Sequence, residues 1–185
     1  MRSRLLALLL PTLLLALSCS REPEGVRRYI EETGALPRGP GARAGAPLVQ
    51  FTPPAAWERL GGSGMRLEAF RAPGAVEVAL ARLPGDGGGF EANLRRWFGQ
   101  LGVAPGNLEV QQFIESLSNE TTWGGWPLML LDLSAFTREG APTMLIAYAQ
   151  GPNFVLTLKA SASASALRGI QADFNALARS LRPGN

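Results

Sequence analysis

The chain has 185 residues, with 18 basic and 15 acidic side chains, no histidine, one cysteine (Cys19) and one lysine (Lys159). It therefore cannot hold a Ser-His-Asp or Cys-His catalytic group, a zinc site built on histidine or cysteine, or an internal disulfide. Its basic residues cluster most densely as the pairs Arg27-Arg28 and Arg95-Arg96. No nucleic-acid partner is expected, because nucleic acids are bound by a clustered basic face.

Residues 1–18 have the pattern of a signal peptide. Two arginines precede the apolar run Leu5–Leu17, and small or aliphatic residues come directly before Cys19. The run of 13 residues is shorter than the roughly 20 that a membrane-spanning helix needs. We therefore predict that this segment directs export to the cell envelope and is then removed.

The residues Ala16, Leu17, Ser18 and Cys19 resemble the lipobox of bacterial lipoproteins. The resemblance implies cleavage before Cys19, a diacylglyceryl thioether on its sulfur, and acylation of the new amino terminus with a fatty acid such as palmitate. Stable anchoring takes at least two such chains, so the membrane itself is an expected partner. Ser20 stands where an aspartate would imply inner-membrane retention, so the resemblance implies the outer membrane, facing the periplasm. The alternative is an ordinary secretory signal cut near Ala16, with Cys19 left as a free thiol.

Residues 19–46 are predicted to form the lipidated N-terminus and a flexible tether. This segment is rich in Gly, Pro, Ala and Arg, and its stretch Pro37–Ala42 cannot maintain a helix or a strand ladder. Residues 47–183 have the length of a single globular domain, and no internal repeat indicates a second one.

The domain begins with strand patterns. Leu48–Thr52 predicts a short strand, and the alternating runs Met65–Ala72 and Val76–Leu83 flank a turn at Pro73-Gly74. The first run is expected to place two sets of side chains on opposite faces: Met65, Leu67 and Ala69 on one, and Arg66, Glu68 and Phe70 on the other. We expect an antiparallel hairpin with one face covered.

A helix is predicted after the Gly-rich loop 85–89. Its apolar stripe repeats at helical spacing and consists of Phe90, Leu94, Trp97 and Leu101. Gly102 is expected to end the helix, because glycine is favoured just beyond a helix C-terminus.

One polar strip on this helix is the candidate binding surface. Asn93, Arg96 and Gln100 share a face next to Trp97, so hydrogen-bond donors, a charge and an aromatic edge lie together. With the nearby Arg66, these residues form the expected contact surface. The alternative is an internal role, in which Asn93 and Arg96 hold the Gly-rich loop and the strand that carries Arg66 or Asp132.

An antiparallel meander is predicted over residues 115–160, with its first turn at Trp123-Gly124-Gly125-Trp126. Trp123 and Trp126 form a secondary candidate site, because two indoles can hold a sugar or a peptide. The alternative is that they cap an open end of the core.

The last predicted element is a helix over residues 163–181. Its apolar positions repeat every three or four residues, at Leu167, Ile170, Phe174, Leu177 and Leu181. Together these patterns predict an α+β fold, with an antiparallel sheet of about six strands flanked by two main helices.

This order of elements is similar to the PsbP-like fold, an αβα sandwich. A denser set of residues resembles the signature of a family of uncharacterised exported bacterial proteins: Trp57, Ser63, Met65, Arg66, Phe70, Pro84–Asp86, Gly88-Gly89, Asn93, Arg96-Trp97 and Gly99–Gly102. The PsbP-like resemblance implies non-catalytic assistance to a membrane complex, with no enzyme activity, cofactor or metal.

The leading hypothesis is thus a lipid-anchored envelope module that binds another envelope protein and assists its assembly or stability, in an oligomeric state that the sequence leaves open. An alternative is a receptor for a small ligand held between the sheet and the helix Gly89–Leu101. A third hypothesis is a hydrolase whose paired carboxylates come from Asp86, Glu109, Glu115 and Asp132.

Overall fold

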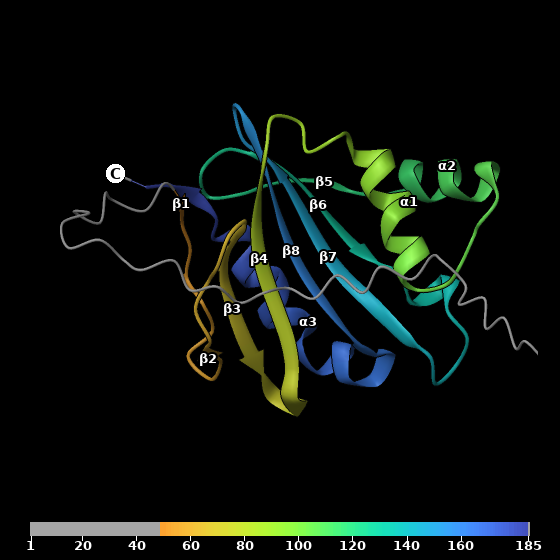
Figure 1. Cartoon of the computed structure of the whole chain (residues 1–185), viewed down its shortest axis with the longest axis horizontal. Coiled ribbons are helices and arrows are strands. Elements are labelled where there is room, and N and C mark those ends of the chain that lie inside the picture. Colours follow the sequence, from red (N-terminus) through yellow and green to blue (C-terminus); the bar gives the residue numbers. More distant parts are fainter. Residues whose placement is uncertain (1–48, 185) are drawn as a thin grey trace, which may run out of the picture. The chain divides into compact units, whose positions relative to one another are not determined.

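The computed structural model describes residues 49–184 (Figure 1). The predicted signal peptide, Cys19 and the tether over residues 19–46 lie outside the described residues. The helices are α1 (Phe90–Gln100), α2 (Asn107–Ser116) and α3 (Ala164–Arg179), with short 3-10 helices η1 (Pro73–Ala75) and η2 (Ser134–Phe136). The strands are β1 (Val49–Gln50), β2 (Glu58–Arg59), β3 (Arg66–Ala72), β4 (Val76–Pro84), β5 (Asn119–Thr121), β6 (Pro127–Asp132), β7 (Pro142–Gln150), β8 (Phe154–Ser163) and β9 (Arg182–Pro183).

Seven strands form one antiparallel sheet in the order β2-β3-β4-β8-β7-β6-β5, and β1 pairs with β9 in a separate two-stranded sheet. The predicted α+β class is confirmed. The sheet is wider than the six strands expected, because β2, which is too short to show an alternating pattern, pairs with β3 at the edge. The meander expected from residue 115 begins later, since α2 continues to Ser116 and only Asn119–Thr121 (β5) pairs with β6 before the first turn.

Helices cover both faces of the sheet, and β7 shows why. Its side chains alternate between two cores: Leu145 and Ala147 face the core that includes α3, whereas Ile146 and Tyr148 face the core that includes α1 and α2. The inner residues of β7 are all buried, as expected for a strand covered on both sides. The result is the layered αβα arrangement that the sequence predicts, with α1 and α2 on one face and α3 on the other (Figure 1).

The helix boundaries follow from local chemistry. The Ser163 hydroxyl accepts a hydrogen bond from the Ala166 N–H at 3.3 Å and caps α3. At the end of α1, Gly102 has a φ of +69°, which allows Val103 N–H to reach back to Phe98 O at 3.0 Å. Within residues 49–184, no helix is both long enough and apolar enough to cross a membrane.

The hairpin of β3 and β4 forms as predicted, but Arg66 does not share the face of Glu68 and Phe70 as expected. The register shifts between Arg66 and Glu68, which is a β-bulge. Because a one-residue shift moves every later side chain to the opposite face, Phe70 becomes fully buried while Leu67 stays 39% exposed. The bulge therefore leaves an apolar side chain at the surface.

Candidate functional site

Asn93 is a structural residue and not part of an exposed strip. Its side chain is only 2% exposed, and its Nδ2 donates to Gly87 O at 2.9 Å and to Gly89 O at 2.7 Å. Its Oδ1 accepts from Arg96 Nη1 at 2.7 Å. The amide thus satisfies two carbonyls of the Gly-rich loop, which is the internal role that the sequence left as the alternative.

Trp97 is also buried, so it does not contribute to a contact surface. It packs edge-on against Tyr148 of β7, with 6.4 Å between ring centroids. Leu94, Phe98 and Ile146 belong to the same core. The interface between α1 and the sheet is filled with side chains, which counts against a ligand held between them.

Lys159 of β8 joins the exposed members of the predicted strip. Its Nζ donates to Gln100 Oε1 at 3.0 Å, and its pKa is lowered by burial and by the positive charge of Arg66. Arg66 is paired with Glu77 of β4 at 2.9 Å. Gln100 of α1 and Arg66 of β3 therefore lie near Lys159 of β8. Helical spacing could not predict that Lys159 belongs to this polar group, because it lies on another element.

The two tryptophans of the meander turn have different environments. Trp126 is buried and packs edge-on against Phe154, with 5.2 Å between centroids, so it caps the core. Trp123 is 66% exposed, and the guanidinium of Arg182 lies 5.7 Å from its ring centroid. The turn thus offers one exposed indole and not a pair.

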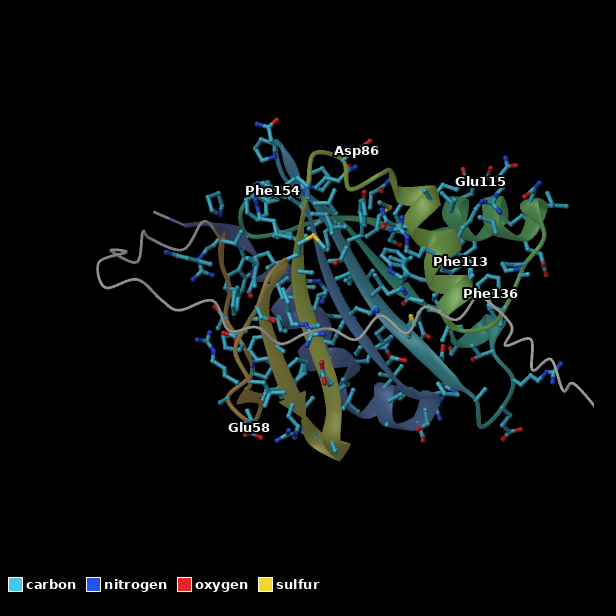
Figure 2. The ribbon with its side chains drawn as sticks, in the orientation of Figure 1. Glu58, Asp86, Phe113, Glu115, Phe136 and Phe154 are labelled. Atoms are coloured by element: carbon cyan, nitrogen blue, oxygen red, sulfur yellow. The ribbon has the colours of Figure 1, made fainter. Side chains whose placement is uncertain are left out.

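The four carboxylates considered for a hydrolase each have a local partner. Asp86 and Asp132 accept from the backbone N–H two residues later, Glu109 accepts from Gly106 N–H, and Glu115 accepts from Gln111. Figure 2 shows Asp86 in the β4-α1 loop and Glu115 on α2. Among residues 49–184, no group of three acidic or cysteine side chains is arranged to bind a metal ion.

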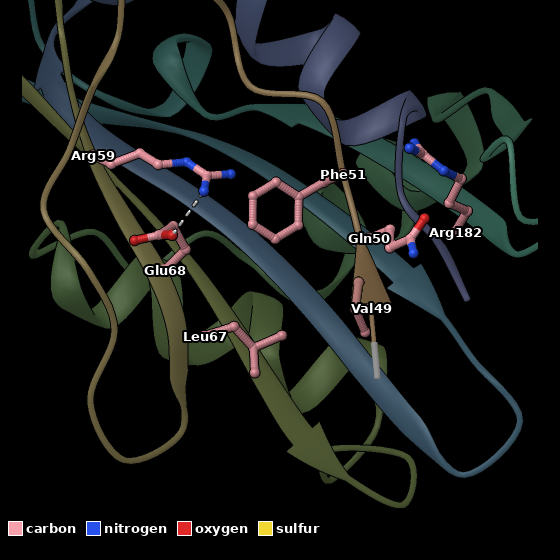
Figure 3. A pocket seen from close by; sticks show the side chains of 7 residues that line it. All are labelled: Val49, Gln50, Phe51, Arg59, Leu67, Glu68 and Arg182. Carbon is pink, nitrogen blue, oxygen red and sulfur yellow. Dashed lines mark ion pairs between the residues drawn. The ribbon is translucent and has the colours of Figure 1, made fainter. Parts of the chain in front are cut away.

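A cavity of about 490 Å³ lies beside β1, β2 and β3 (Figure 3). Its apolar lining comes from Val49, Phe51 and Leu67, and its polar lining from Gln50, Arg59, Glu68 and Arg182. Phe51 is fixed by an edge-on contact with Phe70, with 6.0 Å between centroids. This volume is within the range of roughly 300–1,000 Å³ that is typical of small-molecule sites.

Charges of both signs line this cavity. Arg59 and Glu68 form a long ion pair, with Nη1 3.9 Å from Oε2, and the Arg59 guanidinium also lies 5.5 Å from the Phe51 centroid. Arg182 Nη1 donates to Ser180 O at 3.0 Å. Figure 3 shows Arg59 and Glu68 on one side of Phe51, and Arg182 with Gln50 on the other.

The loop between β2 and β3 and the start of β3 carry a second surface feature, three exposed apolar side chains, Leu60, Met65 and Leu67, which we call the apolar patch. These side chains are 41%, 64% and 39% exposed. The loop is held close to β3, because Leu60 N–H donates to Ala69 O at 2.8 Å. A side chain at Gly62 would collide with the backbone carbonyl of Leu67, which indicates how closely the two segments pack.

No protein-family model and no curated protein matches the sequence. Several solved structures are similar at low identity. One, from Bacteroides thetaiotaomicron, is 12% identical with a TM-score of 0.43, and the match covers 75% of this chain but 46% of that protein. LpqN, which is described as involved in cell envelope biogenesis of Mycobacterium tuberculosis, is 18% identical with a TM-score of 0.45 over 78% of this chain and 87% of LpqN. The cyanobacterial PsbP protein of Synechocystis, CyanoP, is 12% identical with a TM-score of 0.41, and the match covers 80% of this chain and 99% of CyanoP.

Sequence reasoning missed both the cavity and the patch. The cavity combines residues from distant parts of the chain, and neither Phe51 nor Arg182 stands out by spacing. The patch arises because the bulge in β3 turns Leu67 outward. The one available signal was the glycine-rich stretch 61–64, whose Gly61 and Gly64 have φ angles of +83° and +61° and form the tight loop.

Proposed function

We propose that this protein is a lipid-anchored, non-catalytic module of the cell envelope that binds another envelope protein and assists its assembly or stability. The observation that carries the binding role is the exposed apolar patch of Leu60, Met65 and Leu67. These three large apolar side chains are exposed within one stretch of eight residues, and exposed apolar surface of this kind is typical of protein contact sites. The anchoring role is supported by the apolar run and lipobox before Cys19.

The strands next to the patch carry charged residues, which are common at the rim of protein interfaces. Three ion pairs join neighbouring strands: Arg59 to Glu68 at 3.9 Å, Arg66 to Glu77 at 2.9 Å, and Arg71 to Glu58 at 2.8 Å. Most of these side chains are half-exposed, so they are available to a partner at little cost in desolvation. The apolar side chains would supply most of the binding affinity, and the charged pairs would fix the orientation of the partner.

The tight backbone of the patch favours binding without rearrangement. Arg82 N–H donates to Met65 O at 2.9 Å, and Ala69 N–H donates to Gly61 O at 3.1 Å, so both ends of the loop are fixed. A surface that is already ordered loses little conformational entropy when a partner binds. The flexible side chain of the exposed Met65 adapts to an irregular partner surface.

The contact is tested by substituting Met65→Glu in the full-length protein, purified from gently solubilised membranes. A matched control is Leu108→Glu, because Leu108 of α2 is 66% exposed and Met65 is 64% exposed. We expect Met65→Glu to lose a specific co-purifying envelope protein while Leu108→Glu retains it. Equal recovery with the two variants, or no specific partner with the wild type, would overturn the contact.

Anchoring is tested separately. Cys19→Ala is expected to move the protein from the membrane fraction to the soluble fraction, and mass spectrometry of the wild type is expected to show acyl chains on Cys19. Density separation of the two membranes is expected to place the protein in the outer one. An unmodified Cys19 thiol in native material would contradict the anchored role and leave the patch experiment unaffected.

A further inference from the structure

The cavity beside β1, β2 and β3 contains a carboxylate that receives no hydrogen bond from the described residues. Glu68 Oε1 is buried without a partner, and Oε2 has only the 3.9 Å contact with Arg59, which is beyond hydrogen-bond distance. The Glu68 side chain is 14% exposed. A carboxylate without donors is costly, and Glu68 lines the cavity. Oε1 is enclosed by the protein, so Oε2 is the atom suited to accept a hydrogen bond from a bound molecule.

The opposite end of the cavity offers a positive charge. Arg182 is held in place by its hydrogen bond to Ser180 O and by its position over the Trp123 ring. A guanidinium has five N–H donors, and the contacts recorded for Arg182 all use Nη1, so donors remain for a ligand. Such a group binds a carboxylate well.

The middle of the cavity is apolar. Phe51 lies between the two charged ends (Figure 3), and Val49 and Leu67 complete the apolar lining. A fatty acid would leave Glu68 without a donor, and a simple amine would leave Arg182 without an anion. The lining therefore matches a molecule that has a cation at one end, an anion at the other and an apolar group between them.

We propose that this cavity binds a short peptide of about two or three residues with free termini and an apolar side chain, a size that suits the cavity volume. The amino terminus donates to Glu68, the carboxylate accepts from Arg182, and the apolar side chain packs on Phe51 and Leu67. This inference goes beyond the proposed function, because it concerns a small ligand and requires neither the protein partner nor the acyl chains.

The test is calorimetric titration of the full mature protein in detergent with alanyl-leucyl-alanine. We expect saturable binding at one site, weakened at least about tenfold when the peptide is N-acetylated and likewise when it is C-amidated. Glu68→Gln is expected to weaken binding of the unmodified peptide by a similar factor but to have little further effect on binding of the N-acetylated peptide. This non-additivity assigns the amino terminus to Glu68.

Two further variants complete the test. Glu77→Gln is the matched control, since it neutralises an exposed carboxylate on β4 outside the cavity, and it is expected to leave binding unchanged. Leu67→Trp fills the cavity from an exposed position and is expected to abolish binding without lowering the melting temperature. The proposal is overturned if the wild type shows no saturable binding at millimolar peptide, if N-acetylation has no effect, or if the folded Leu67→Trp variant still binds.

Discussion

Arg179, in the last turn of α3, forms a two-point ion pair with Glu120 of the edge strand β5. Its Nε lies 2.6 Å from Oε2, and its Nη2 lies 3.0 Å from Oε1. The two residues are 59 positions apart in the chain, so the pair joins the end of a helix to the far edge of the sheet. Parallel hydrogen bonds of this kind fix orientation as well as charge.

The pair predicts a pH-dependent stability. The hydrogen bond from Arg179 lowers the pKa of Glu120, against the opposing effect of desolvation. A carboxyl group whose pKa is lowered by folding stabilises the folded state above its unfolded pKa, near 4.5, and this contribution is lost as the pH falls through the lower folded value. Because both side chains are partly exposed, Glu120→Gln is expected to cost about 1 kcal/mol or less at neutral pH.

Urea denaturation of wild type and Glu120→Gln at neutral and acidic pH measures this effect. The difference in unfolding free energy should disappear in acid. Glu91→Gln is the control, because it removes an exposed ion pair with Arg95 within one helix. It is expected to change the free energy of unfolding by about 0.3 kcal/mol. A Glu120→Gln difference that is constant with pH would contradict the prediction.

Asn93→Ala is expected to destabilise the domain by about 1–3 kcal/mol. The substitution removes donors to the carbonyls of Gly87 and Gly89 in a buried site. Arg96→Ala removes only the bond to Asn93 Oδ1 from an exposed side chain, so its cost should be clearly smaller. Thermal unfolding of the two variants decides between an internal and a surface role, and equal small effects would support the surface role.

Lys159→Met is expected to raise the melting temperature at neutral pH. Burial and the charge of Arg66 lower the pKa of Lys159 from its ordinary 10.5, so the charged lysine opposes folding until it loses its proton. The folded state releases this proton at a lower pH than the unfolded state. Wild-type stability therefore rises, relative to the variant, as the pH increases from the lowered pKa toward 10.5.

Melting curves of wild type and Lys159→Met from neutral to alkaline pH check this trend. Arg168→Met on the exposed face of α3 serves as the control and should show no such dependence. If the advantage of Lys159→Met does not shrink with rising pH, the lowered pKa is not the cause.

Two glycine substitutions are expected to have opposite signs. A methyl group at Gly169 in α3 meets no atom within 4 Å. Gly169→Ala should therefore stabilise the domain by about 0.5–1 kcal/mol, because alanine lowers the conformational entropy of the unfolded chain. A methyl group at Gly124 would lie 2.7 Å from the Cα of Arg182, so Gly124→Ala should destabilise it by about 1–3 kcal/mol. Chemical denaturation measures both, and a stabilised Gly124→Ala would show that β9 can move aside.

Regular patterns in the sequence predicted the elements whose side chains repeat at one spacing. The stripe of Leu94 and Trp97 located α1, and that of Leu167 and Phe174 located α3. The predicted strip was wrong for Asn93, because helical spacing groups Asn93 with Arg96 and Gln100 but does not say which of them faces the core. Asn93 faces it because the carbonyls of the Gly-rich loop require donors there.

Features made by contacts between distant segments could not be predicted. The bulge after Arg66 has no local signature, although it decides that Leu67 is exposed and Phe70 buried. The cavity depends on the pairing of β1 with β9, which brings Arg182 beside Gln50. Such pairings are set by the packing of the whole domain, and a periodic pattern in one segment contains no information about them.

The antiparallel pairing of Val49 with Pro183 places the start and the end of the described fold side by side. Domains with adjacent ends tolerate insertion and circular permutation. Residues 49–184 can therefore be grafted as a unit into a loop of a cytosolic host protein, with both junctions at one point. Such a chimera would separate the folding of the domain from the export and acylation proposed for the chain, and would allow the domain to be studied alone.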